Sequence, residues 1–307
     1  MEPDEAKVFP RWLYYWLLWD TEGIKKAHGV GATMLHVTKG SMEQRSISVP
    51  PLTEQRRIVA ILDEAFKDIS KATENAERNL ANARELPEAL LERALESQNG
   101  WREAGLSEIA EFKNGLNFTR TSNGEEIKIV GVKDFQNDYW VPSAGLESVS
   151  IDGNLAPNYE LRPNDILTVR SNGNKQLIGR CIIARDVPEK TSHSGFTIRI
   201  RVQADDVRPE FLTYVLKRRV TRATLVASGD GANITSLNQQ ALAALQVSFP
   251  DLKLQDEILA KIRFELGEAN KLLDIRRNSL SKLNDLRKSV LRKAFSGQLT
   301  KTKASAA

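Results

Sequence analysis

The chain has 307 residues, with 44 Lys and Arg against 40 Asp and Glu, and this length favours about two domains. Hydrophobic residues make up 41% of the chain and charged residues 27%, a composition that is typical of folded globular proteins and excludes a disordered one. A single cysteine, Cys181, excludes an internal disulfide framework and a cysteine-based zinc cluster, and a net charge of +4 does not by itself indicate nucleic-acid binding.

The first predicted element is a short aromatic helix around Trp12 to Trp19, with the sequence WLYYWLLW. This run is shorter than the roughly 18 apolar residues that a membrane helix needs. The acidic residues Glu2, Asp4 and Glu5 precede it, where a signal peptide would carry basic residues. We therefore expect a buried amphipathic helix and no membrane contact. The use of one cysteine fits a reducing compartment, so the expected location is the cytoplasm.

Residues 31–62 and 231–262 resemble each other without gaps at an offset of 200 positions. The identical residues of this repeat are Gly31 and Gly231, Ala32 and Ala232, Pro50 and Pro250, Leu52 and Leu252, Gln55 and Gln255, and Ile58 and Ile258. With a one-residue slip, the match continues upstream from Pro10, Leu13 and Tyr15 to Pro209, Leu212 and Tyr214. The chain therefore contains two copies of one structural unit.

Each copy continues into a long helical segment whose apolar residues recur in alternating steps of three and four. Such a period of about 3.5 residues is typical of a coiled-coil seam. The first seam comprises Leu62, Phe66, Ile69, Thr73, Ala76, Leu80, Ala83, Leu86 and Leu90. The second comprises Ile262, Leu266, Ala269, Leu273, Arg276, Leu280, Leu283, Leu286 and Val290. Pro87 predicts a kink or an early end of the first helix.

The charges of the two helical segments are complementary. Residues 52–98 carry 7 basic and 10 acidic side chains, whereas residues 251–307 carry 13 basic and 7 acidic ones. This difference supports pairing of the two helices with each other, although it does not set their direction. The alternative is a pair of unrelated amphipathic helices, each on its own domain.

The segment between the helices, residues 101–250, is predicted to be an α+β domain. Short β-like runs with Asn-Gly and Asp-Gly turns occupy residues 127–132, 166–170, 179–184 and 196–202. In the last run, FTIRIRV, the residues Phe196, Ile198, Ile200 and Val202 alternate onto one face. A helix is expected at residues 209–223, with Pro209 in its first turn.

Basic residues gather at two places in this domain. The loop from Arg170 to Lys175, RSNGNK, follows an apolar strand and offers donors to phosphates and base edges. The second cluster is Lys217, Arg218, Arg219 and Arg222. A solvated surface explains both clusters equally well, because the domain is almost neutral, with 18 basic and 17 acidic side chains.

Motifs of catalysis are missing from the sequence. It contains neither the P-loop pattern G-x-x-x-x-G-K-[ST] nor G-x-G-x-x-G. The histidines, His28, His36 and His193, lack metal-ligand spacing, and His193 is interpreted as a loop residue. Cys181 lies in an apolar run and is interpreted as a core residue. We therefore expect a protein that binds no metal and is not an enzyme.

Several segments resemble type I restriction–modification specificity subunits, and the resemblance covers nearly the whole chain. The segments are VPPLTEQRRIVAILDEAF (49–66), GWREAGLSEIAEFKNG (100–115), IKIVGVKDF (127–135), NDILTVRSNG (164–173), IGRCIIA (178–184) and LRKSVLRKAFSGQLT (286–300). The resemblance implies a target recognition domain that reads one half of a split DNA site, flanked by two long helices that form an antiparallel coiled coil. It also implies docking of methyltransferase subunits, and possible association with a motor-nuclease subunit or a second specificity chain. S-adenosylmethionine, ATP and Mg would belong to those partner subunits.

This resemblance gives the expected domain organisation. Residues 1–51 correspond to the end of a first recognition domain, 52–98 to the first helix, 101–250 to a complete recognition domain, 251–298 to the second helix and 299–307 to a tail. About a hundred residues of the family pattern have no counterpart before Met1, including those matching Lys113, Lys133 and the Arg170 loop. The alternative function is therefore a truncated scaffold or decoy that binds methyltransferase subunits without productive DNA recognition.

The residues expected to contact double-stranded DNA lie in the polar loops of residues 101–250. They are Arg170, Ser171, Asn172, Asn174 and Lys175, followed by Asn117, Arg120, Thr121 and Asn233. For each of them the alternative is a role in forming a turn or in positioning the phosphate backbone.

Overall fold

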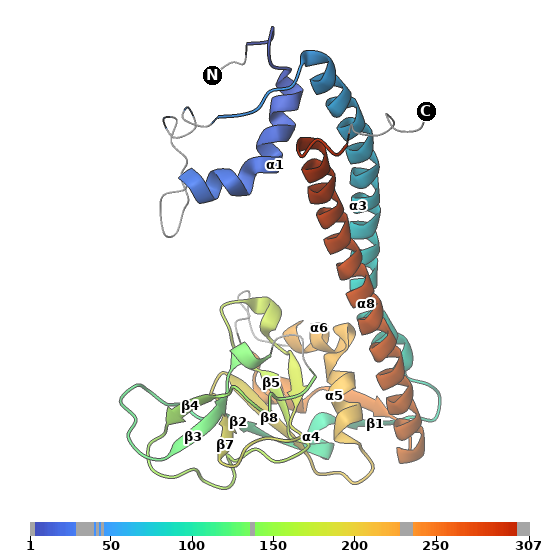
Figure 1. Ribbon diagram of the computed structural model, residues 1–307. Helices are drawn as coiled ribbons and strands as arrows, with labels where there is room; N and C mark the ends of the chain where they lie inside the picture. Colours follow the sequence, from blue (N-terminus) through green and yellow to red (C-terminus); the bar gives the residue numbers. More distant parts are fainter. Residues whose placement is uncertain are drawn as a thin grey trace. The chain divides into compact units, whose positions relative to one another are not determined.

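The computed structural model describes residues 4–28, 40, 43, 46–135, 139–227 and 236–299 (Figure 1). The chain divides into two compact units, Met1–Arg84 with Asn270–Ala307 and Glu85–Ala269. The start of each repeat, His36, Asn233 and residues 300–307 lie outside the described residues, as does the side chain of His28. No helix in the described ranges is long and apolar enough to cross a membrane.

Two long helices account for the seam-bearing segments. Helix α3 spans Leu52–Ala94 and helix α8 spans Leu252–Phe295. The expected early end of the first helix at Pro87 is wrong, because α3 continues through this residue to Ala94. Each helix has residues in both units, so the contacts of each unit are described separately.

In the first unit, the aromatic helix α1 (Pro10–His28) packs on both long helices. Trp12, Tyr15 and Trp16 are buried in one cluster with Leu62 of α3 and Leu291 of α8. The ring of Trp12 also meets that of Phe295 edge to face, with 5.7 Å between their centroids. The prediction of a buried amphipathic helix around Trp12 to Trp19 is thereby confirmed.

Contacts between α3 and α8 within this unit pair rising residue numbers on one helix with falling numbers on the other. Leu62 clusters with Leu291, whereas Leu80 clusters with Leu273. Between them, the Arg287 guanidinium lies over the Phe66 ring, 5.2 Å from its centroid. These pairs are consistent with helices that run in opposite directions.

Most residues of the predicted seam are buried or half-buried, and the exceptions lie at the same place in each copy. Leu86 is 39% exposed and Leu286 is 48% exposed, so neither belongs to the buried face. Leu91 and Leu291 are buried instead, at 8% and 6% exposure. The other predicted seam residues are buried or half-buried. The shift has a physical reason: near their C-terminal ends the helices pack against other elements, Leu291 against α1 and Leu91 in the core of the second unit.

The second unit is an α+β domain with three small sheets (Figure 1). One sheet has the order β2-β8-β5-β6, formed by Ala110–Asn114, Thr197–Val202, Ile166–Val169 and Cys181–Ile183. The second has the order β4-β3-β7, formed by Glu147–Ser150, Glu126–Val130 and Thr191–His193. Strands β1 (Arg102–Gly105) and β9 (Gln246–Phe249) form the third.

Short helices complete this domain. They are α4 (Leu106–Ile109), α5 (Pro209–Lys217), α6 (Arg219–Ala227) and α7 (Gln239–Ala243), with 3-10 turns η1 at Val132–Asp134 and η2 at Lys175–Leu177. Phe211 and Leu212 of α5 share a buried cluster with Ile198 of the sheet and Leu259 of α8. The same cluster contains Leu95 from the end of α3.

Three predictions for this domain need correction. The helix expected at residues 209–223 is two helices, because Arg218 is extended (ψ 141°) and binds Glu92 through its guanidinium. Phe196 precedes β8 and is 61% exposed instead of facing the core. His193 is a fully buried residue of β7, which pairs in parallel with β3, and is not a loop residue.

The repeat is visible in equivalent hydrogen bonds of the two units. Gln55, at 0% exposure, donates to the carbonyls of Pro50 and Lys7 and accepts from the backbone N–H of Phe9, at 2.7, 2.9 and 2.7 Å. In the other unit Gln255, also at 0% exposure, has the same three types of partner. They are the carbonyls of Pro250 and Asp206 and the N–H of Arg208, each at 2.8 Å. We call each set of three bonds a glutamine contact.

An ion pair between equivalent positions has opposite polarity in the two copies. In the first unit Arg11 Nε lies 2.8 Å from Asp63 Oδ1. In the second unit Arg263 Nε donates to Glu210 Oε1 at 2.9 Å. The acid is thus on the long helix in one copy and on the short helix in the other. The acid and the base occupy exchanged positions in the two copies, so an attractive ion pair is present in both.

Candidate nucleic-acid interface

The predicted DNA-contacting loops meet at one turn of the second unit. This turn, Ser194 to Phe196, joins β7 to β8. On one side the Gly195 N–H donates to the Leu116 carbonyl at 2.7 Å. On the other side the Arg170 N–H donates to the Phe196 carbonyl at 2.8 Å. The turn therefore fixes the loops that follow β2 and β5 next to each other, although 53 positions separate Asn117 from Arg170 in the chain.

Two glycines, Gly115 and Gly195, lie where these loops meet. A Cβ atom at this position would clash with the Asn117 side chain, and one at Gly115 would clash with the backbone of Ser194. Gly115 therefore permits an approach of the two backbones that no other residue allows, whereas a Cβ atom at Gly195 would require only the end of the Asn117 side chain to move. Asn117, a predicted contact residue, is thus placed against the turn.

Arg170 braces the same turn and is half-buried. Its Nη1 donates to the Gly195 carbonyl at 3.4 Å, and its own carbonyl accepts from the Leu237 N–H at 2.6 Å. Ser171 follows it, with its N–H 3.3 Å from the Phe196 carbonyl and a bridge to Ser236. The first two residues of the predicted loop are therefore held by the domain itself.

The two asparagines of this loop stabilise turns. Asn172 Oδ1 accepts from the Asn174 N–H at 2.8 Å, and Asn174 Oδ1 accepts from the Gln176 N–H at 3.0 Å. Asn174 thereby caps η2, in which Lys175 is exposed. This geometry supports the turn-forming alternative for the two oxygen atoms. It leaves the amide nitrogen atoms available.

The loop that follows β2 carries the remaining candidates on an exposed surface. Thr121 Oγ1 lies 2.9 Å from Thr119 Oγ1, so it takes part in a local turn. Arg120 and Lys175 are exposed, and neither has an ion-pair partner among the residues that the structure describes. These two cations are therefore free for an external anion such as a phosphate.

A hollow of about 450 Å³ opens beside the turn. Its lining residues are Val132, Ser171, Asn172, Gly173, Phe196 and Ser236. Phe196 is the functional candidate that sequence reasoning missed, because alternation assigned it to the buried face of a strand. The one available signal was its position directly after Gly195, where a strand is about to begin.

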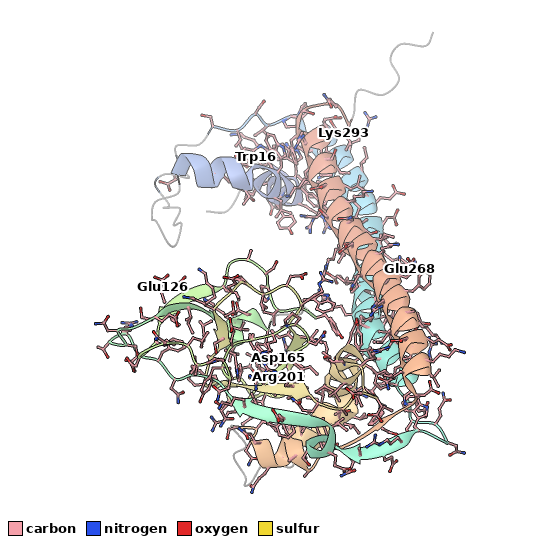
Figure 2. All side chains as sticks on the ribbon, turned by 90° about the horizontal axis from the view of Figure 1, so that it is seen from below. Trp16, Glu126, Asp165, Arg201, Glu268 and Lys293 are labelled. Carbon is pink, nitrogen blue, oxygen red and sulfur yellow. The ribbon has the colours of Figure 1, made fainter. Side chains whose placement is uncertain are left out.

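Buried polar residues lie in β8 and directly before β5, the strands that adjoin the turn and the Arg170 loop. Asp165, 1% exposed, binds the Arg201 guanidinium through both oxygens at 2.6 and 2.7 Å, and both side chains are labelled in Figure 2. The hydrogen bonds that Arg201 donates to Asp165 raise the pKa of Arg201. Arg199 is buried beside this pair and donates to the Asn158 carbonyl at 2.8 Å. Burial lowers the pKa of Arg199.

His193 is the third buried group of this region. Its Nδ1 lies 2.9 Å from Thr197 Oγ1, whose hydroxyl donates to the Ser194 carbonyl at 2.8 Å. Because that proton is used, Nδ1 must be the donor, which places the histidine proton on Nδ1. Burial, reinforced by Arg199 and Arg201, lowers the pKa of His193 to about 3. The ring is therefore neutral at physiological pH and unsuited to proton transfer there.

The second basic cluster has mainly structural partners. Lys217 Nζ donates to the Cys181 carbonyl at 3.0 Å, Arg218 pairs with Glu92 at 2.9 Å, and Arg222 Nε donates to the Ile178 carbonyl at 2.9 Å. Burial lowers the pKa of Arg222. Only Arg219 of this cluster is exposed. These contacts favour the DNA-binding interpretation of the Arg170 loop over that of the Lys217 cluster.

Catalytic chemistry gains no support from the described residues. They contain no group of three or more His, Cys, Asp or Glu side chains that could hold a metal ion. Cys181 is 2% exposed, and burial raises the pKa of its thiol. It is a small core residue, as expected from its apolar surroundings in the sequence.

Comparisons with known proteins identify the family of this chain. A family model described as the type I restriction modification DNA specificity domain matches residues 2–78 and 98–279. The specificity subunit of the type I restriction enzyme StySPI from Salmonella potsdam is 27% identical over 283 residues. The match covers 88% of this chain and 61% of that subunit, so the chain spans about three fifths of the relative's length.

Solved structures show the same fold. The HsdS subunit from Thermoanaerobacter tengcongensis matches 97% of this chain and 73% of its own, with a TM-score of 0.58 and 19% identity. A chain from a structural study of complex assembly in the type I R-M system matches 97% of this chain and 74% of its own, with a TM-score of 0.79 and 18% identity. The matching family is one of DNA specificity domains and not of catalytic domains, which agrees with the expectation that the chain is not an enzyme. The chain belongs to the type I restriction–modification DNA specificity family.

Proposed function

We propose that this chain is the DNA-recognition subunit of a type I restriction–modification complex in the cytoplasm, and that residues 101–250 form its target recognition domain. The observation that carries the proposal is the meeting of two polar loops at the Ser194–Phe196 turn. Those loops carry the exposed cations Arg120 and Lys175, and the hollow at the turn is lined in part by hydroxyl and amide groups. Cations position a phosphate backbone, and polar side chains read base edges. In this proposal the domain reads one half of a bipartite site.

The two long helices have a second role in this proposal. Helices α3 and α8 form an antiparallel coiled coil, with Arg287 covering Phe66 and Leu80 meeting Leu273 in the first unit. Methyltransferase subunits dock on this coiled coil and supply the S-adenosylmethionine chemistry. A motor-nuclease subunit, with its ATP and Mg, and a second specificity chain are further candidate partners.

Lys175 provides the cleanest test of DNA contact, because it is exposed and makes no bond that the domain needs. We expect Lys175→Ala to weaken duplex binding and to reduce the slope of log affinity against log salt concentration by about 1, the value for one lost phosphate contact. The measurement is a salt titration of duplex binding by the complex with its methyltransferase subunits. Arg219→Ala, which removes an exposed cation from the other basic cluster, is the matched control. Equal slopes for Lys175→Ala and wild type would contradict the placement of DNA at this loop.

The same complex distinguishes the proposed recognition function from the alternative, a scaffold or decoy. Co-purification with a methyltransferase subunit, followed by methylation of a defined duplex sequence, supports the recognition function. Co-purification without methylation of any duplex supports the scaffold or decoy instead. Arg170→Ala should change the preferred sequence, because Arg170 braces the turn through Gly195.

A further inference from the structure

Phe196 is exposed but fixed in place. Its side chain is 61% exposed, whereas its carbonyl accepts from the N–H groups of Arg170 and Ser171 at 2.8 and 3.3 Å. The preceding Gly195 is bonded to Leu116 and covered by Asn117. An aromatic ring is thus presented to solvent on a turn that is held from both sides. Because the backbone of this turn is already ordered, little backbone entropy is lost when the ring meets a partner.

The hollow next to this ring is lined by both apolar and polar side chains. Phe196 and Val132 provide apolar surface, whereas Ser171, Asn172 and Ser236 provide polar groups. A ligand that fills it must therefore carry an apolar group next to a hydrogen-bonding group. Pockets of this composition select by matching both features at once.

The hydrogen bond of Asn172 defines which polar group faces the ligand. Because Oδ1 accepts from the Asn174 N–H at 2.8 Å, the orientation of the amide is set and Nδ2 is the free end. Nδ2 has no acceptor among the residues that the structure describes. This end of the side chain is a donor, so it selects an acceptor on the ligand.

Among the four bases, thymine fits these requirements best. In the major groove, thymine carries an O4 acceptor next to a C5 methyl group, guanine carries acceptors without a methyl group, and cytosine carries a donor. Adenine presents an acceptor together with a donor, and it lacks the methyl group that the apolar side chains of Phe196 and Val132 would contact. We propose that the hollow reads a thymine, with Phe196 against the C5 methyl group and Asn172 Nδ2 donating to O4. This inference rests on the proposed DNA recognition and names the base at one position of the half-site.

The test removes the methyl group and the ring separately. The complex with its methyltransferase subunits is first used to select its preferred sequence from random duplexes. Each thymine of that sequence is then replaced in turn by uracil, which lacks the methyl group and keeps O4. With wild type we expect binding to weaken about four-fold at one thymine, the effect of one buried methyl group. With Phe196→Ala we expect that position to bind thymine and uracil equally.

Two control variants keep the result interpretable. Phe264→Ala removes another exposed phenylalanine, 70% exposed on α8, and should retain the thymine preference of wild type. Phe196→Gln keeps a side chain of similar length without its apolar surface, so it should lose the preference even if Phe196→Ala were poorly folded. A wild-type complex that ignores uracil at every position would overturn the inference, as would a uracil effect that persists in both Phe196 variants. Loss of all sequence-selective binding by the wild-type complex would instead contradict the proposed function, and the inference with it.

Discussion

His193 and Asp165 show how single buried residues support the candidate interface. Asp165 neutralises Arg201 through two hydrogen bonds, and His193 is kept neutral between β7 and Thr197. Neither residue reaches solvent, since both are at most 1% exposed. Buried charges of this kind are strongly destabilising when one partner is removed. The turn that carries Phe196 therefore rests on polar contacts that its own sequence does not reveal.

The depressed pKa of His193 predicts an acid-sensitive domain. An unfolded histidine titrates near 6.5, whereas His193 titrates at about 3 in the folded chain. Between these values the unfolded state binds the extra proton, so folding stability falls as the pH decreases from 6.5 towards 3, by up to about 1.4 kcal/mol per pH unit. Chemical denaturation between pH 5 and 7 measures this slope before most carboxylates titrate. His193→Gln should flatten it, and an unchanged slope in that variant would rule out His193 as the cause.

The loop residues illustrate what could and could not be predicted at this scale. The sequence suggested that Asn172 and Asn174 face DNA, because asparagine suits base edges. Whether their oxygens are occupied depends on the path of the loop, which brings the Asn174 and Gln176 N–H groups within 3.0 Å. Similarly, alternation assigns residues to two faces of a strand but does not say where the strand begins, and so it misplaced Phe196.

At the scale of elements, the long helices were the most predictable part of the chain. Their 3.5-residue period and the 200-residue offset together predicted helices that the structure describes as 43 and 44 residues long. Of the predicted seam residues, only Leu86 and Leu286 are exposed, and the buried face there moves to Leu91 and Leu291. A period records which residues are apolar. It does not record that α1 or a globular core, instead of the partner helix, covers the last turns.

Because the buried face shifts in this way, we expect unequal losses of stability when neighbouring leucines are replaced. Leu91→Ala should lower the free energy of unfolding by about 2–3 kcal/mol, because it leaves a cavity in the cluster with Leu259. Leu86→Ala, at a 39% exposed site on the same helix, should cost less than about 1 kcal/mol. Urea denaturation of the two variants gives the comparison. Leu291→Ala and Leu286→Ala repeat the experiment in the other unit. A larger loss for Leu86→Ala than for Leu91→Ala would restore the seam as first predicted.

At the scale of the whole chain, the repeat became a pair of equivalent glutamine contacts. Sequence comparison aligned Gln55 with Gln255, although nothing in the sequence alone could show that both are fully buried. Their partners are main-chain groups around residues 7–9 and 206–208, which the one-residue slip of the alignment had already paired. The slip is therefore real: 46 positions separate Phe9 from Gln55, whereas 47 separate Arg208 from Gln255, so the first copy is one residue shorter between these points.

From the glutamine contacts we predict that each of the two units can be destabilised by itself. Gln255→Leu leaves two carbonyls and one N–H without partners, which should cost about 2–4 kcal/mol. Because all three partners lie in Glu85–Ala269, hydrogen exchange should accelerate at α5 and β9 and change little at α1. Gln55→Leu should produce the reverse pattern. Gln240→Ala, at an exposed site on α7, is the control. Equal acceleration in both units would show that the chain unfolds as one cooperative body.

The chemistry of the glutamine contact also bears on how such a chain can diversify. The hydrogen bonds of each glutamine contact involve only backbone atoms, so the contact survives any substitution at residues 7, 206 and 208 that preserves the path of the chain and, at residue 208, the N–H group. The polarity of the nearby ion pair has in fact reversed between the copies while both contacts remain. A glutamine contact therefore does not depend on the side chains of the domain next to it. Exchange of one domain for another at the two glutamine contacts would then require no change in the sequence of the helices.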